Sequence, residues 1–147
     1  MASRYSAGLL TAAGSTTLPI AALVGASTIR PRIWEIGVFN TTATAVALKL
    51  VRMTTAGTPG TAASAIATHV PEDSAPVGAV RGTYSSTAPT ITDSRYRCVL
   101  GAAIGSGCIW TFGDSGLIIP AVTAAAVGIV VENGTGQACQ CYFVWQE

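Results

Sequence analysis

One short loop carries residues that could form a nucleophilic catalytic site. In Gly113-Asp114-Ser115-Gly116 a serine stands between small residues, as in the nucleophile loop of serine proteases, and His69 is the one histidine available as its base. Such a site also needs a buried carboxylate that orients the imidazole and a second barrel that frames the cleft, and 147 residues are too few for two barrels. A four-residue turn explains the same residues, because Gly, Asp and Ser are common in turns. We therefore predict that the chain is not an enzyme and has no catalytic residues.

A second group of residues could bind a metal ion. His69 is followed by Glu72 and Asp73, and imidazole and carboxylate groups are common metal ligands. One histidine and two carboxylates on a proline-rich segment are a weak signal, because acidic side chains on turns are ordinarily solvated. The glycines of residues 101–107 do not match the spacing of a phosphate-binding loop. The sequence thus predicts no metal site and no cofactor.

The chain has four cysteines, namely Cys98, Cys108, Cys139 and Cys141. On a strand, Cys139 and Cys141 would point to the same face with Cα atoms roughly 6.5–7 Å apart, and their parallel side chains suit a disulfide poorly. Zinc sites pair cysteines as C-x₂₋₄-C, which the C-x-C spacing does not match. We expect buried free thiols that pack as small hydrophobic side chains.

The composition favours a protein that associates with other copies of itself. Hydrophobic residues make up 50% of the chain and charged residues only 10%, against about 25% in typical soluble proteins. The formal net charge of +1 gives no electrostatic reason to expect nucleic acid or an anionic membrane as a partner. A surface so poor in charge is weakly protected against association, so we expect a homo-oligomer.

Two segments in the first third alternate as β-strands do. Residues 28–40 and 44–54 are rich in β-prone side chains and are joined by only three residues, which predicts a hairpin. In the first of these strands, Trp34, Ile36 and Val38 are expected on one face.

The last third contains further short apolar runs at residues 96–100, 108–112, 117–119, 127–131 and 138–145. Asn133-Gly134 between the last two runs predicts a hairpin turn, because both residues accept a positive φ. Ala124-Ala125-Ala126 favours a helix, but the β-branched Val127 and Ile129 that follow favour a strand, which is our prediction.

Residues 55–89 are interrupted by many glycines and prolines, so we expect only short strands there, near residues 65–70 and 77–84. No repeat of fixed period is visible. Many short strands with regular turn signals predict an all-β protein, a single-domain jelly-roll-like antiparallel β-sandwich spanning residues 1–147. Within it, residues 1–27 are expected to form an N-terminal arm plus the first strand.

Positive charge is concentrated at two short motifs. These are Arg30-Pro31-Arg32 and Arg95-Tyr96-Arg97. Solvated strand ends explain them most simply, but arginine is also favoured at protein interfaces, where its guanidinium binds acidic groups. Trp145, two residues from the chain end, is either a core residue or an interface anchor. We therefore treat Arg30, Arg32, Arg95, Arg97 and Trp145 as candidate interface residues.

Several segments of the sequence resemble those of small structural proteins of tailed bacteriophages, especially phages of actinobacteria. They are Arg4-Tyr5-Ser6-Ala7-Gly8-Leu9-Leu10, Arg30 to Thr42, Gly107 to Phe112 with Gly116 to Ala121, and Gly134 to Gln137 with Tyr142 to Trp145. The resemblance spans nearly the whole chain and is weakest over residues 55–95.

The resemblance implies a virion protein without catalysis, most simply a capsid decoration or cement protein. Such proteins are commonly jelly-roll trimers that are made in the host bacterial cytoplasm, sit on the outer capsid surface and clamp the phage major capsid protein. Arg4 and Tyr5 would then lie on an arm that contacts the shell, and deleting residues 2–10 should abolish binding while the domain still folds.

Two other functions stay open at this stage. The first is a tail, neck or fibre component of the same virion. The second is a carbohydrate-binding jelly-roll module, for which Trp34, Tyr84 and Trp145 are the candidate exposed aromatic residues.

Overall fold

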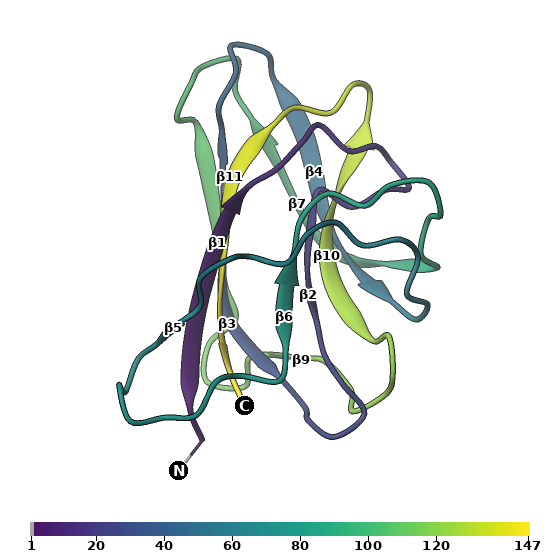
Figure 1. The fold of residues 1–147 in the computed structure, drawn as a ribbon. Helices are drawn as coiled ribbons and strands as arrows, with labels where there is room; N and C mark the ends of the chain where they lie inside the picture. Colours follow the sequence, from purple (N-terminus) through teal and green to yellow (C-terminus); the bar gives the residue numbers. More distant parts are fainter. Residues whose placement is uncertain (1) are drawn as a thin grey trace.

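The computed structural model describes residues 2–147 and consists of two antiparallel β-sheets packed face to face (Figure 1). No helix occurs within these residues. The strands are β1 (Arg4–Leu10), β2 (Ala21–Val24), β3 (Arg32–Asn40), β4 (Val46–Met53), β5 (Ala67–Thr68), β6 (Ala79–Arg81), β7 (Ile91–Leu100), β8 (Gly107–Thr111), β9 (Leu117–Ile118), β10 (Ala126–Asn133) and β11 (Cys139–Gln146).

The strand order is that of a jelly roll. One sheet, called here the β1 sheet, has the order β5-β1-β11-β3-β8 with β9 also beside β3, and the other, the β2 sheet, has the order β6-β2-β10-β4-β7. Apart from the short strands β5, β6 and β9, each of β1 to β4 pairs with one late strand: β1 with β11, β2 with β10, β3 with β8 and β4 with β7. Each sheet is completed by a central pair, β11 with β3 in one and β10 with β4 in the other. The first strand thus pairs with the last, as in a jelly roll, where a long hairpin is rolled into two sheets. The predicted all-β sandwich of jelly-roll type is confirmed.

Both predicted local hairpins are wrong. Strands β3 and β4 lie in different sheets, and Asn40 holds the link between them, because its Nδ2 donates to the carbonyls of Thr44 (2.7 Å) and Gly101 (3.1 Å). Strands β10 and β11 also lie in different sheets. A tight hairpin turn of the expected type needs positive φ at both central residues, and here Gly134 has φ 72° whereas Asn133 has no positive φ.

The N-terminal residues form sheet rather than an arm. Strand β1 pairs with β11 along its whole length, from Arg4 opposite Gln146 to Leu10 opposite Gln140. Tyr5 is only 3% exposed, and its ring lies 5.7 Å from that of Trp145, which is fully buried. Interface roles for Tyr5 and Trp145 are therefore wrong, since both side chains fill the core. Deleting residues 2–10 would remove a strand and core side chains, so the structure leads us to expect that the shortened chain does not fold.

A β-bulge in β3 changes the predicted faces of that strand. Glu35 lies opposite Val144, whereas Ile33 lies opposite Trp145, so Trp34 is the extra residue. Because the bulge adds one residue, Ile33 joins Ile36 on the core face, and both are fully buried. Trp34 was expected on that face but is only half-buried.

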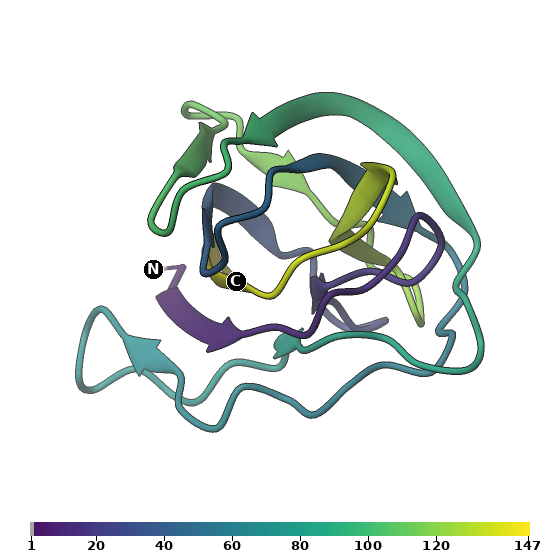
Figure 2. The same ribbon diagram turned by 90° about the horizontal axis from the view of Figure 1, so that it is seen from above.

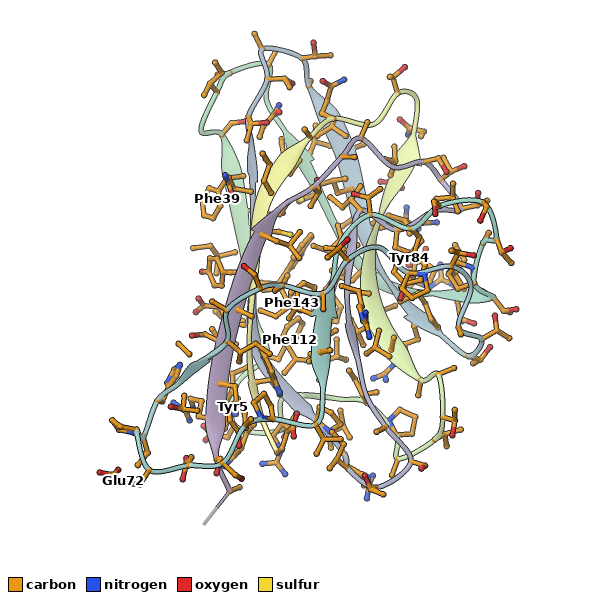
Figure 3. The ribbon with its side chains drawn as sticks, viewed as in Figure 1. Tyr5, Phe39, Glu72, Tyr84, Phe112 and Phe143 are labelled. Carbon is orange, nitrogen blue, oxygen red and sulfur yellow. The ribbon has the colours of Figure 1, made fainter. Side chains whose placement is uncertain are left out.

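The core lies between the two sheets and is built from the inward side chains of both. Its largest fully buried members are Trp145, Phe143, Ile20, Leu23, Ile33, Ile36, Leu48, Leu50, Leu100, Ile119, Ile129 and Val38. Figure 3 shows Phe143 in the middle of the sandwich. Strand β10 is buried on both faces from Ala126 to Val131, which confirms a strand rather than a helix there.

The proline-rich segment explains why β10 is buried on its outer side as well. Tyr84, which follows β6, packs with Val51, Met53 and Val130 in a second cluster on the outer face of the β2 sheet. Burial raises the pKa of Tyr84 to about 12. Figure 2 shows this teal segment running along the outside of the sandwich. The short strands expected here are present as β5 and β6, but shorter than predicted.

Phe143 tests the position of the core. Replacing Phe143 by Ala should lower the free energy of unfolding by about 3–5 kcal/mol, because the ring is fully buried between the sheets. The matched control is Val144→Ala on the outward face of the same strand, which should cost about 1 kcal/mol or less. Denaturant unfolding measures both, and equal losses would contradict the proposed packing.

Candidate interaction surface

The structure separates the candidate base from the candidate nucleophile. His69 directly follows β5, and its backbone N–H donates to the carbonyl of Arg4, whereas Ser115 lies in the turn after β8. Strands β5 and β8 are the opposite edges of the β1 sheet, four strand spacings apart, which is about 19 Å. These two side chains therefore cannot act as a catalytic pair.

The metal-binding alternative gains no support. Within residues 2–147, no three His, Cys, Asp or Glu side chains are grouped so that they could hold a metal ion. Glu72 lies at the tip of the loop between β5 and β6, at the lower left of Figure 3.

The cysteines are free, and they differ in burial. Cys139 and Cys141 are buried in the core, whereas Cys98 on β7 and Cys108 on β8 are half-buried and pack against it from the edge. Burial, together with the neighbouring Cys108 thiol, raises the pKa of Cys98 to about 12. Burial raises the pKa of Cys141 to about 12 as well, and that of Cys139 to about 11.

Three of the candidate arginines gather at the end of the sandwich that holds both chain ends, called here the arginine end (Arg4, Arg30 and Arg32; lower part of Figure 1). Arg30 and Arg32 line a shallow depression of about 200 Å³ beside Glu147. The guanidinium of Arg4 lies 4.7 Å from the centre of the Trp34 ring, a cation–π contact. Within the described chain, none of the three forms an ion pair.

The carboxylate that shares the depression with Arg30 and Arg32 already has hydrogen-bond partners. The side chain of Glu147 accepts hydrogen bonds from the backbone N–H groups of Val77 and Gly78 and from the indole of Trp145, each at 2.8 Å. These bonds fix the C-terminal end against the loop before β6. The arginine end therefore presents guanidinium groups whose acidic neighbour is engaged elsewhere.

The other arginine motif is used within the protein. Arg97 pairs with Asp93 on its own strand and with Glu132 on β10, and Lys49 lies 3.9 Å from Asp93. A hydrogen bond from the Arg95 backbone N–H, together with the nearby cations, lowers the pKa of the Asp93 carboxyl below its usual value. Arg95 itself has φ 71° and is exposed. The structure therefore does not bring the two predicted arginine motifs together.

A further exposed region was missed by sequence reasoning. Of the eight large exposed hydrophobic side chains among residues 2–147, half lie on β7, on β8 or in the loop that connects them, namely Tyr96 (40%), Val99 (72%), Ile104 (75%) and Ile109 (51%). Tyr96 packs edge-on against Phe112, with ring centres 5.2 Å apart, across the gap between the sheets. We call β7, β8 and their connecting loop the open edge. Its signal in the sequence was too weak to find, because edge position depends on long-range pairing.

The three candidate aromatic residues do not form the exposed platform that a carbohydrate site needs. Trp145 and Tyr84 are buried, and Trp34 is half-buried beneath Arg4. On the outer face of the β1 sheet, the Tyr142 ring covers Gly37, where a Cβ atom would lie 2.1 Å from it. Burial and the hydrogen bond from its hydroxyl to Glu35 (2.5 Å) raise the pKa of Tyr142 to about 12.

Comparisons with protein-family models, with curated proteins and with solved structures found no match to the chain. Residues 2–147 contain no helix long and apolar enough to cross a membrane. Two surfaces of the described chain present groups suited to a partner: the arginine end presents guanidinium groups without ion pairs, and the open edge presents exposed hydrophobic side chains.

Thiol reactivity tests the burial of the cysteines. At pH 8 a thiol with a pKa of about 12 is ionised to about one part in ten thousand, against about a quarter for an ordinary thiol. Iodoacetamide should therefore alkylate Cys98 and Cys141 about a thousandfold more slowly in the folded protein than in denaturant, as read by peptide mass spectrometry. Equal rates in both conditions would show that the sulfurs are not buried as described.

Proposed function

We propose that this chain is a non-enzymatic structural subunit of a virus particle, a decoration protein that binds the outer surface of an assembled phage capsid. The sequence resemblance to phage structural proteins gives the proposal its context. The jelly-roll sandwich suits it, because a rigid two-sheet body loses little conformational entropy when it docks.

The observation that carries the proposal is the arginine end. Arg4, Arg30 and Arg32 come from two separate segments, yet the fold places them at one end, without an ion pair among the described residues. Guanidinium groups bind carboxylates through paired, charge-assisted hydrogen bonds. The partner that fits is an acidic surface on the capsid lattice.

The physical logic of decoration requires a preference for the assembled shell. A protein that binds the shell but not its loose subunits stabilises the shell by mass action. Many copies bound through modest contacts then act together. Three arginines that each contribute a charge-assisted contact suit this kind of repeated, individually modest binding.

A tail, neck or fibre subunit is the alternative within the same class, and location on the particle separates it from decoration. The carbohydrate-binding alternative is weaker, because Tyr84 and Trp145, two of its three candidate aromatic residues, are in the core.

Co-sedimentation with capsid shells that lack this protein tests the proposal. The wild-type chain should sediment with the shells, and added salt should weaken binding because exposed charges are screened. Arg30→Glu should weaken binding by about tenfold or more, since it places a like charge against an acidic surface. The matched control is Arg95→Glu, the same change on the open edge, which should bind as the wild type does.

Two outcomes would contradict decoration. The first is a wild-type chain that stays in the supernatant with shells while it sediments with purified tails, which would assign it to the tail. The second is equal binding by the wild type and Arg30→Glu, which would remove the arginine end from the interface.

A further inference from the structure

The strands at the margins of the two sheets differ in how they are protected against pairing with another chain. On one margin, β5 has two residues and β6 has three, so neither offers a long template. On the other margin, the register of β7 against β4 is interrupted, and Arg95 has a left-handed backbone conformation. Strand β7 also carries two exposed arginines. Short strands, bulges and charges are the devices by which proteins block edge pairing.

Strand β8 has none of these devices. Its sequence, Gly107-Cys108-Ile109-Trp110-Thr111, contains no charge and no proline. Its register with β3 runs without a break from Gly107 opposite Phe39 to Thr111 opposite Glu35. Figure 2 shows β8, in green, at the outer margin of the molecule. Among the described strands, β8 is therefore the margin that is left open to another chain.

The hydrogen-bonding pattern shows which backbone groups are free. Phe112, just after β8, donates its N–H to the carbonyl of Trp34 (3.1 Å). Because antiparallel hydrogen bonds recur at every second residue, the N–H and C=O of Ile109 point away from β3. The Ile109 side chain is itself 51% exposed. An apolar side chain and two unpaired backbone groups thus meet at the centre of the strand.

We propose that β8 pairs in antiparallel fashion with β8 of a second copy, about a two-fold axis at Ile109, so that the two β1 sheets become one continuous sheet. The pairs would be Ile109 with Ile109, Cys108 with Trp110, and Gly107 with Thr111. A second copy fits because the strand is uncharged, so that no like charges meet, and because its donors and acceptors are self-complementary about that axis.

This contact is independent of the arginine end and of the proposed capsid role. It gives a dimer, whereas the resemblance to decoration proteins implies a trimer, and the two differ in mass. Analytical ultracentrifugation over a wide range of protein concentration therefore tests the contact directly.

Two substitutions at the axis should disrupt the dimer. Ile109→Pro removes the outward donor without removing a bond to β3, and Ile109→Lys brings two like charges together. Each should raise the dimer dissociation constant by about tenfold or more, while circular dichroism shows that the fold is kept. Val99→Lys is the matched control, since it puts the same charge at an exposed apolar site on β7 and should leave the dimer intact.

A cross-link provides a test that does not depend on losing the contact. Directly opposed residues in a hydrogen-bonded antiparallel pair have Cα atoms about 5.5 Å apart, within disulfide range. Ile109→Cys should therefore form a covalent dimer with glutathione disulfide as the oxidant, which is reduced to two glutathione thiols. Val99→Cys should not.

The proposal is overturned if the wild type is monomeric at all concentrations, if it is a trimer, or if its dimer is unaffected by both Ile109 substitutions. The proposal is also overturned if β8 binds an extended segment of another protein while the chain itself remains monomeric. Arg30→Glu should leave the dimer unchanged, so that loss of capsid binding and loss of self-association are read separately.

Discussion

Pairing of the first strand with the last is the constraint on which the rest of the structure depends. Strands β1 and β11 are matched over seven residue pairs, and beyond them Ser3 and Glu147 exchange two backbone hydrogen bonds of 3.0 Å. Once the ends are joined, the remaining long strands pair inward in order, β2 with β10, β3 with β8 and β4 with β7. The same pairing brings the chain ends to the arginine end and leaves β8 at a margin.

The charged residues follow from this arrangement. The chain has 8 basic and 7 acidic residues, and the β7 side of the sandwich concentrates four of them, because β4, β7 and β10 bring Lys49, Asp93, Arg97 and Glu132 together. Backbone N–H groups occupy the Glu147 carboxylate, and Arg4 and Arg30 at the arginine end form no ion pair within the described residues. The charged side chains around β7 therefore pair with one another, whereas the guanidinium groups of the arginine end have no charged partner within the described residues.

The sequence could predict most of the strands, though not β2, and it could not predict their partners. Alternation in residues 139–145 marks one face of β11, but the sequence left Trp145 either in the core or at an interface, and only the structure places it in the core. The pairing of β3 with β8 and β11, in place of β4, depends on contacts between residues far apart in the chain, which no local turn signal encodes. The bulge at Trp34 was invisible for the same reason, because a bulge is defined only against a partner strand.

The candidate site was predictable only in part. Arg30 and Arg32 were recognised as a concentration of charge, but their separation from Arg95 and Arg97 required the fold. Ile109 could not be singled out, since its run of apolar residues reads like any core strand until the sheet order places it at a margin. Exposure of an apolar strand edge is thus a property of topology more than of composition.

The open margin at β8 is tested most directly by hydrogen exchange of the Ile109 amide at low and at high protein concentration. Pairing between copies predicts that this exchange slows as concentration rises, while amides on β7 exchange at the same rate in both samples. Fast exchange at Ile109 that does not change with concentration would contradict it.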